Sequence, residues 1–307
     1  MNVQPTREPV LPADRHRLLR GHLMNEISST RQARGGARPY RRLRWAAVPA
    51  LAGGLALALV LTAGGGTEVS AAEVLDRAAS GAAGQPVPDA RDGRFVYVRS
   101  LVAFSGSNEA THEQVPAGTP HERQLWQSVD GSRPGLLVEE GQRPGRAVKP
   151  GDPYPPNPDG SEPLEPNTAP GVNAPTYRFL ASLPTRPDEL LARIYADTRG
   201  AGVSPDQEAF ATIGDLLREQ LAPPAVTAAL YRAAARIPGV TAVPDAVDAS
   251  GRHGVAVAHT SGGLRTEWIF DRATYAFLGE RETRDGEVLG RSAVLERAVV
   301  SAAGERP

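Results

Sequence analysis

Apolar and polar residues alternate in short runs along the C-terminal third of the chain, with turn residues between the runs. This alternation is typical of β-strands that have one face on a core and one face in water. One face of the run 264–271 carries Leu264, Thr266, Trp268 and Phe270, and the other carries Arg265, Glu267 and Asp271. The pattern predicts an antiparallel meander with strands at Thr241–Val247, His253–Thr260, Leu264–Asp271, Ala276–Arg284 and Val288–Val299. Residues 301–307, beyond the last strand, are expected to fray.

A second group of strands is predicted before residue 141. The run Phe95–Phe104 is rich in β-branched and aromatic residues, and Arg123–Val129 and Gly135–Glu139 flank an Asp130-Gly131 turn signal. Residues 141–175 then contain ten prolines and almost no apolar run. We expect an extended loop within one domain there, and a linker between two domains is the alternative.

Apolar residues at helical spacing predict three helices between the two groups of strands. Pro187 begins the first, Ser204 caps the second in a capping box, and Pro223 or Pro224 begins a third that ends at Ile237. Another capping box, Ser70 with Glu73, begins a helix that runs through Ala79 and ends at the following glycines. The predicted fold is α+β: an antiparallel, curved, half-barrel-like sheet with a three-helix insertion.

One stretch near the N-terminus predicts a transmembrane helix at residues 45–64. It has no charged residue from Trp45 to Ala63, and Leu51, Leu55 and Leu59 lie along it. As a helix these nineteen residues measure about 28 Å, close to the hydrocarbon core of a bilayer. Arginines precede the stretch, so the positive-inside rule predicts a cytoplasmic N-terminus and an extracytoplasmic domain at residues 65–307. The alternative is a cleaved signal peptide, with a small-residue site at Val69-Ser70-Ala71.

Residues 1–44 form a basic arm with ten arginines against three acidic residues, although the whole chain has a net charge of −1. Such an arm is attracted to anionic membrane lipid. Within it, residues 12–27 predict a short amphipathic helix whose apolar face carries Leu18, Leu19, Leu23 and Ile27. This face is a candidate for binding a cytoplasmic partner, or it lies on the inner leaflet. Nucleic acid is not expected as a partner, because the arm has one aromatic residue, Tyr40, and no DNA-reading module.

The sequence carries no constellation that predicts catalysis, a cofactor or a metal site. It has no cysteine, no G-x-S-x-G elbow, no P-loop and no H-E-x-x-H motif. His253 and His259 lie about 20 Å apart along one predicted strand, which is too far to share a metal. The paired acids Glu139-Glu140 and Glu280 with Glu282 are expected to be exposed charges at strand ends. Trp126 and Trp268 are expected in the core or on a sheet face.

The layout resembles a family of uncharacterised actinobacterial single-span membrane proteins. The resemblance rests on R-R-L-R-W-A before the span, S-A-A-E-V-L-D-R-A-A after it, and three later motifs. These motifs are Y-R-F-L-A-S-L-P at 177–184, D-E-L-L-A-R-I-Y at 188–195 and E-W-I-F-D-R-A-T-Y-A-F-L-G-E at 267–280. The arrangement is similar to that of single-span anti-sigma factors, with an outer domain similar to lipoprotein-carrier and sigma-regulator folds.

The resemblance implies a membrane-anchored extracytoplasmic sensor or regulator that is not an enzyme. Its inner arm would bind a sigma factor or another regulator, and its outer domain would bind an envelope lipid or protein. The alternative is a tethered or secreted lipid- or lipoprotein-binding module, for which the concave apolar face of a curved sheet would serve as the site.

The predicted topology can be tested by adding protease to intact and permeabilised protoplasts that carry an N-terminally tagged full-length protein. We expect membrane-bound protein that external protease trims to a tagged fragment ending just beyond the span. A soluble, exported product that begins near Ala72 would contradict the anchored topology.

Overall fold

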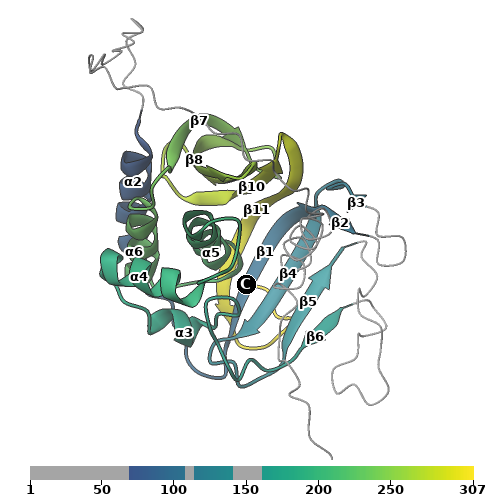
Figure 1. The fold of residues 1–307 in the computed structure, drawn as a ribbon. Coiled ribbons are helices and arrows are strands. Elements are labelled where there is room, and N and C mark those ends of the chain that lie inside the picture. Colours follow the sequence, from purple (N-terminus) through teal and green to yellow (C-terminus); the bar gives the residue numbers. More distant parts are fainter. Residues whose placement is uncertain (1–68, 108–113, 141–160) are drawn as a thin grey trace, which may run out of the picture.

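The computed structural model describes residues 69–107, 114–140 and 161–307, and a nine-stranded antiparallel sheet dominates it (Figure 1). Along the sheet the strands follow the order β6-β5-β4-β1-β11-β10-β9-β8-β7. Their bounds are β1 Phe95–Phe104, β4 His121–Ser128, β5 Gly135–Glu139, β6 Glu162–Leu164, β7 Thr241–Val247, β8 His253–Ser261, β9 Leu264–Phe270, β10 Phe277–Arg284 and β11 Glu287–Val300. Two short strands, β2 at Gly106–Ser107 and β3 at Gln114–Val115, pair separately. The large sheet is open, because β6 and β7 lie at its two edges.

The sheet curves around helix α5, Pro205–Glu219. In Figure 1, α5 lies between the strands β8 and β10 on one side and β1 and β4 on the other. Helix α6, Pro224–Ala234, packs on α2, Ala71–Ala83, and on α4, Pro187–Asp197. A short helix, α3, spans Tyr177–Ala181. The main core therefore lies between these helices and the concave face of the sheet.

Close packing of α5 on the sheet depends on a glycine in the middle of the helix. A Cβ atom at Gly214 would lie 2.5 Å from Trp268 Nε1 and 2.6 Å from Glu280 Oε2. Trp268 cannot move aside easily, because it is fully buried and stacks on Phe210 with 3.9 Å between ring centroids. A helix-interior glycine costs about 1 kcal/mol relative to alanine, so the close approach is the physical reason for glycine here.

Both edges of the open sheet contain a proline. Pro163 lies in β6 and Pro244 lies in β7, where the pairing register shifts between Val243 and Ala246. Proline removes a hydrogen-bond donor from an edge, and a bulge twists the edge away from a would-be neighbour. The two edges are therefore poor templates for adding a further strand.

The strands and helix starts follow the sequence prediction closely, whereas several finer expectations were wrong. The insertion contains four helices instead of three, since α3 precedes the predicted ones, and β6 lies inside the predicted proline-rich loop. Helix α2 continues through Gly81 to Ala83. The C-terminal residues do not fray: Trp126 Nε1 donates to the Glu305 carbonyl oxygen at 2.5 Å, and Ala303 packs against the cluster around Trp126.

The face of the meander that carries Arg265 and Glu267 was expected to lie in water, but it is largely covered by other side chains. Glu267 is 2% exposed, and its carboxylate accepts from Arg265 and Arg281 at 2.7 Å each. Ile269, on the same face, is buried with Ala256 and Leu278. Long arginine side chains can cover a face with their aliphatic stems while their charged ends remain at the surface. The alternation of apolar and polar residues therefore predicted the strand. It did not predict that arginine side chains cover the second face of that strand.

No helix within the described residues is long and apolar enough to cross a membrane. The predicted span at residues 45–64, with Trp45, Leu51, Leu55, Leu59 and Ala63, lies outside the described residues.

Substitution of the two helical glycines tests the packing of α5. We expect Gly214→Ala to lower the free energy of unfolding by about 1–3 kcal/mol, because the new methyl group overpacks the contact with Trp268. The matched control is Gly81→Ala in α2, where the nearest atom to an added Cβ is 3.4 Å away. There the higher helix propensity of alanine should leave stability unchanged or raise it by up to about 1 kcal/mol. Equal effects of the two variants in chemical denaturation would contradict this account.

Candidate functional site

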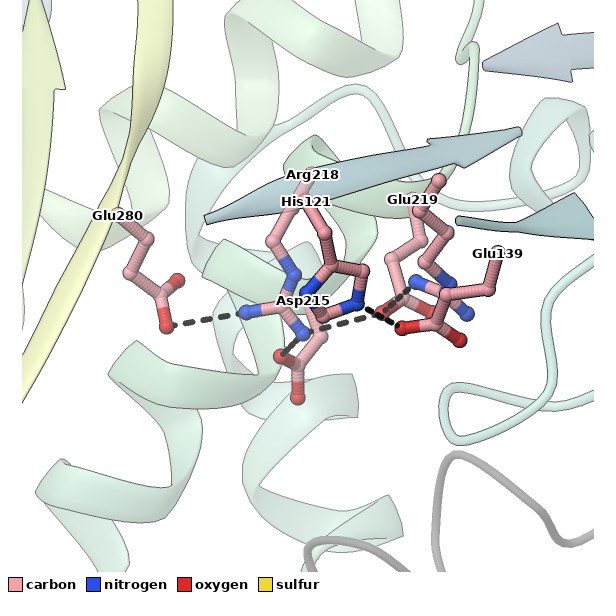
Figure 2. Close-up of polar contacts among 7 residues, drawn as sticks. His121, Glu139, Asp215, Arg218, Glu219 and Glu280 are labelled. Atoms are coloured by element: carbon pink, nitrogen blue, oxygen red, sulfur yellow. Dashed lines mark hydrogen bonds and ion pairs between the residues drawn. The ribbon is translucent and has the colours of Figure 1, made fainter. Parts of the chain in front are cut away.

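The C-terminal half of α5 places a charged cluster on the concave face of the sheet (Figure 2). Arg218 lies at its centre and donates to Asp215 at 2.8 Å, to Glu219 at 3.1 Å and to Glu280 of β10 at 3.1 Å. Arg123 of β4 joins the cluster by donating to Glu219 at 3.4 Å. We call these five residues the Arg218 cluster. It links α5 to strands on both sides of the concave face.

The cluster is largely removed from water, which strengthens its internal interactions. The side chain of Arg218 is 13% exposed and that of Glu280 is 8% exposed. Burial by itself lowers the pKa of Arg218, but the nearby carboxylates of Glu280, Asp215 and Glu219 outweigh it, so the pKa of Arg218 is raised. The guanidinium is therefore firmly charged. Removing it would leave three carboxylates close together.

Another buried arginine holds the end of α5. Arg297 of β11 donates to the carbonyl oxygen of Leu217 in the last turn of the helix. Cations stabilise the C-terminus of a helix, where carbonyl groups lack partners within the helix. Burial lowers the pKa of Arg297, and the neighbouring Tyr231 opposes that shift. This contact fixes the height of α5 above the sheet, and with it the position of Arg218.

A histidine–glutamate pair extends the polar surface across β4 and β5. His121 Nε2 lies 2.7 Å from Glu139 Oε1, and both side chains are 23% exposed. His121 pairs with Val102 in the β1–β4 register, so it shares the concave face with Phe104, two residues further along β1. Water therefore reaches this pair more easily than it reaches Arg218 and Glu280.

A large apolar side chain is exposed beside the charged cluster. Phe104 ends β1 and is 38% exposed. The Arg218 guanidinium lies 5.6 Å from the centroid of the Phe104 ring. We call Phe104 the open end of the concave face. Val288 of β11 is equally exposed, but it pairs with Thr283 beyond a register shift between β10 and β11, so it does not share the face of Gly290 and Phe104.

His259, a further polar residue on the concave face, has a structural role. His259 of β8 is buried, with Nδ1 2.7 Å from Gln207 Oε1 and Nε2 3.1 Å from the Pro238 carbonyl oxygen. Gln207 Nε2 in turn donates to Thr266 at 2.8 Å. Burial lowers the pKa of His259, although the bond to Pro238 opposes the shift. These contacts attach the start of α5 to β8 and β9.

The arrangement suits recognition better than acid–base or metal chemistry. Within the described ranges no group of three or more His, Cys, Asp and Glu side chains could hold a metal ion. The donors of Arg218 are directed at carboxylates, and its guanidinium plane faces an aromatic ring. Arginine and aromatic side chains at a partly dry surface are typical of protein interfaces.

The structure corrects the expectation for three of the four acids that were predicted to be exposed. Glu280 is 6% exposed inside the Arg218 cluster, Glu139 is half-buried against His121, and Glu282 is half-buried as well, whereas Glu140 is exposed. Trp126 and Trp268 are buried, as expected. His253 is exposed whereas His259 is buried, at opposite ends of β8. The predicted partner-binding residues Leu18, Leu19, Leu23 and Ile27 lie outside the described residues.

Arg218, Arg123 and Phe104 were not predicted from the sequence. The one local signal was Gly214, which lies one helical turn before Arg218 on α5. An isolated glycine inside a helical pattern indicates a close packing contact, and a residue four positions later lies on the same face of the helix.

No protein-family model and no curated protein matches this sequence. Among solved structures, the complex structure of Pseudomonas aeruginosa MucA/MucB contains a chain with 15% identity and a TM-score of 0.24, and the match covers 76% of this chain and 58% of that one. The crystal structure of MucB in complex with MucA(peri) gives 13% identity and a TM-score of 0.23, with 76% and 56% covered. The crystal structure of MucB alone gives 15% identity and a TM-score of 0.22, with 76% and 59% covered. The chain thus spans less than two thirds of these chains. The structural similarity to MucB is weak, and no property of MucB is transferred to this chain.

The electrostatic role of Arg218 can be tested by denaturation of the Arg218→Met and Arg218→Lys variants. Methionine keeps the unbranched aliphatic stem but removes the charge, so we expect the free energy of unfolding to fall by about 3–5 kcal/mol at pH 7. The loss should be smaller in Arg218→Lys, because lysine keeps a positive charge among the carboxylates.

The control for this test is Arg91→Met, which breaks the exposed Arg91–Asp89 pair. The Arg91→Met substitution should lower the free energy of unfolding by less than about 1 kcal/mol. Equal losses in Arg218→Met and Arg218→Lys would show that the charge of Arg218 does not stabilise the fold.

Proposed function

We propose that the protein is a non-catalytic regulatory protein that is anchored in the membrane by residues 45–64 and binds a polypeptide partner outside the cytoplasm. The open end of the concave face, Phe104 beside Arg218, is the proposed contact surface. The observation that carries this proposal is the exposed Phe104 ring next to the Arg218 guanidinium.

The composition of this surface favours a protein partner. Binding energy at protein interfaces is concentrated in a few aromatic and arginine side chains, surrounded by polar groups that exclude water. Phe104 and Arg218 provide such a pair, and His121 and Glu139 lie on the same face of the sheet. Because Phe104 ends a strand that is paired with β11, its position is already fixed before a partner arrives.

The packing of the concave face argues against the alternative, a lipid- or lipoprotein-binding module. An acyl chain needs an apolar cavity, and such a cavity would be expected on the concave side of the sheet. In the described part of the chain, α5 lies on that side, with Phe210, Ile213 and Leu216 fully buried. The Arg218 cluster lies beyond them, and placing hydrocarbon against buried charges would be unfavourable.

The basic arm is assigned the cytoplasmic half of the function. Its apolar face, Leu18, Leu19, Leu23 and Ile27, would bind a sigma factor or another cytoplasmic regulator. An isolated helix of this length is marginally stable in water, so a bound partner or the membrane surface would have to stabilise it. The single span then joins an outer binding surface to an inner one.

Site-directed photo-crosslinking in the native cell tests the outer surface. A photoreactive residue at position 104 is expected to give a discrete protein adduct, and Arg218→Lys should weaken it, because lysine keeps the positive charge in the cluster but lacks the planar guanidinium. The matched control is position 87, because Val87 is an exposed large apolar residue at 76% but lies outside the concave face.

The proposal fails if positions 104 and 87 give the same adducts, since that result would indicate random collisions. It also fails if position 104 crosslinks to lipid alone. The circular dichroism spectrum of Arg218→Lys should match that of the parent protein, which separates loss of binding from loss of folding.

A further inference from the structure

Both ring nitrogens of His259 lie beside oxygen atoms. Nδ1 is 2.7 Å from Gln207 Oε1, and Nε2 is 3.1 Å from the Pro238 carbonyl oxygen. A carbonyl oxygen only accepts hydrogen bonds, so Nε2 must carry a proton. A neutral imidazole has one N–H group, whereas a charged imidazole has two. The contacts in the structure therefore suit the charged form of His259, with Nδ1 donating to Gln207.

A second order of hydrogen bonds suits the neutral form. The amide of Gln207 has an acceptor on one side and donors on the other, and the hydroxyl group of Thr266 can donate or accept. In the structure Gln207 Nε2 donates to Thr266 Oγ1 at 2.8 Å. If the amide is reversed, Gln207 Nε2 donates to His259 Nδ1 and Thr266 donates to Gln207 Oε1. The same three side chains can thus satisfy either protonation state.

The surroundings of His259 favour the neutral form at neutral pH without excluding the charged form. Burial lowers the pKa of His259, while the bond to Pro238 and the negative charge of Asp206 oppose that shift. Asp206 of α5 is the one charged group among the described residues that acts on the imidazole. From β9 the hydroxyl group of Thr266 approaches Gln207, and the Phe210 ring lies 5.9 Å from the His259 ring. The ring should therefore take up a proton below its ordinary titration at about pH 6.5.

We propose that His259, Gln207 and Thr266 form a buried proton switch, in which His259 takes up one proton and the hydrogen bonds of the other two side chains reverse while the fold stays intact. Gln207 lies in the first turn of α5, the helix that carries the Arg218 cluster. The regulatory meaning of the switch rests on the proposed location outside the cytoplasm, where the environment sets the pH. The switch itself does not depend on the membrane anchor, so the two ideas can fail separately.

Nitrogen-15 NMR of the full-length protein in detergent micelles, labelled at histidine and glutamine side chains, tests the switch. We expect His259 of the folded protein to titrate reversibly below about pH 6.5. The side-chain amide signals of Gln207 should shift with the same midpoint, because both of its hydrogen-bond partners change. The matched control is His253→Gln, which removes the exposed histidine at the other end of β8. The coupled shifts of His259 and Gln207 should be unchanged in that variant.

Two substitutions at position 207 should move the midpoint of His259 in opposite directions. Gln207→Glu places a carboxylate beside Nδ1, which favours the charged imidazole and should raise the midpoint by about one pH unit or more. Gln207→Met removes the acceptor that the charged imidazole requires, so the midpoint should fall. The circular dichroism spectrum of each variant at pH 7 should match that of the parent protein.

A His259 ring that stays neutral until the protein unfolds would overturn the proposal. Gln207 amide signals that do not follow the titration of His259 would overturn it as well, and so would equal midpoints in the parent, Gln207→Glu and Gln207→Met proteins. The proposed function would survive these outcomes, since it rests on the membrane topology and on crosslinking at Phe104.

Discussion

The contact between Gly214 of α5 and the Trp268–Glu280 pair of the sheet determines how the rest of the domain is arranged. Because position 214 has no side chain, α5 can lie directly on the concave face, with Phe210 stacked on Trp268. The sheet curves around this helix, and α2, α4 and α6 form the remaining helical part of the core. A larger residue at position 214 would separate the two layers and weaken every contact between them.

The same close approach explains why charged groups are buried on this face. Once α5 lies on the sheet, Arg218 enters a region of low dielectric and requires the carboxylates of Asp215, Glu219 and Glu280. Such a cluster contributes little net stability, but it fixes the orientation of the guanidinium over Phe104. The interior of the concave face is thus occupied by the protein itself. The surface proposed for recognition is confined to its open end, where Phe104 is exposed.

Local patterns were enough to predict most of the elements, since strands with one apolar face and helices with capping boxes carry their signal within a few residues. The strand Phe95–Phe104 and the start of α5 after Ser204 are examples. The burial of Glu280 could not be predicted in this way, because its partner Arg218 lies 62 residues away and meets it only in the folded sheet. The contact of Arg281 with Glu267 likewise depends on strand register. The hydrogen bond from Trp126 to the Glu305 carbonyl oxygen depends on tertiary packing. Short elements such as α3 and β6 carry too few residues for a periodic signal.

The central claim is that the concave face is filled by α5, so that the protein regulates through a polypeptide partner and does not carry a lipid. Native mass spectrometry tests it most directly, on the outer domain released by protease from membranes of the native cell under non-denaturing conditions. The account predicts a domain that retains a polypeptide or nothing, and never a stoichiometric lipid. A domain that carries one acyl lipid per chain, and loses it when Phe210 is replaced by a charged residue in a folded variant, would contradict the account.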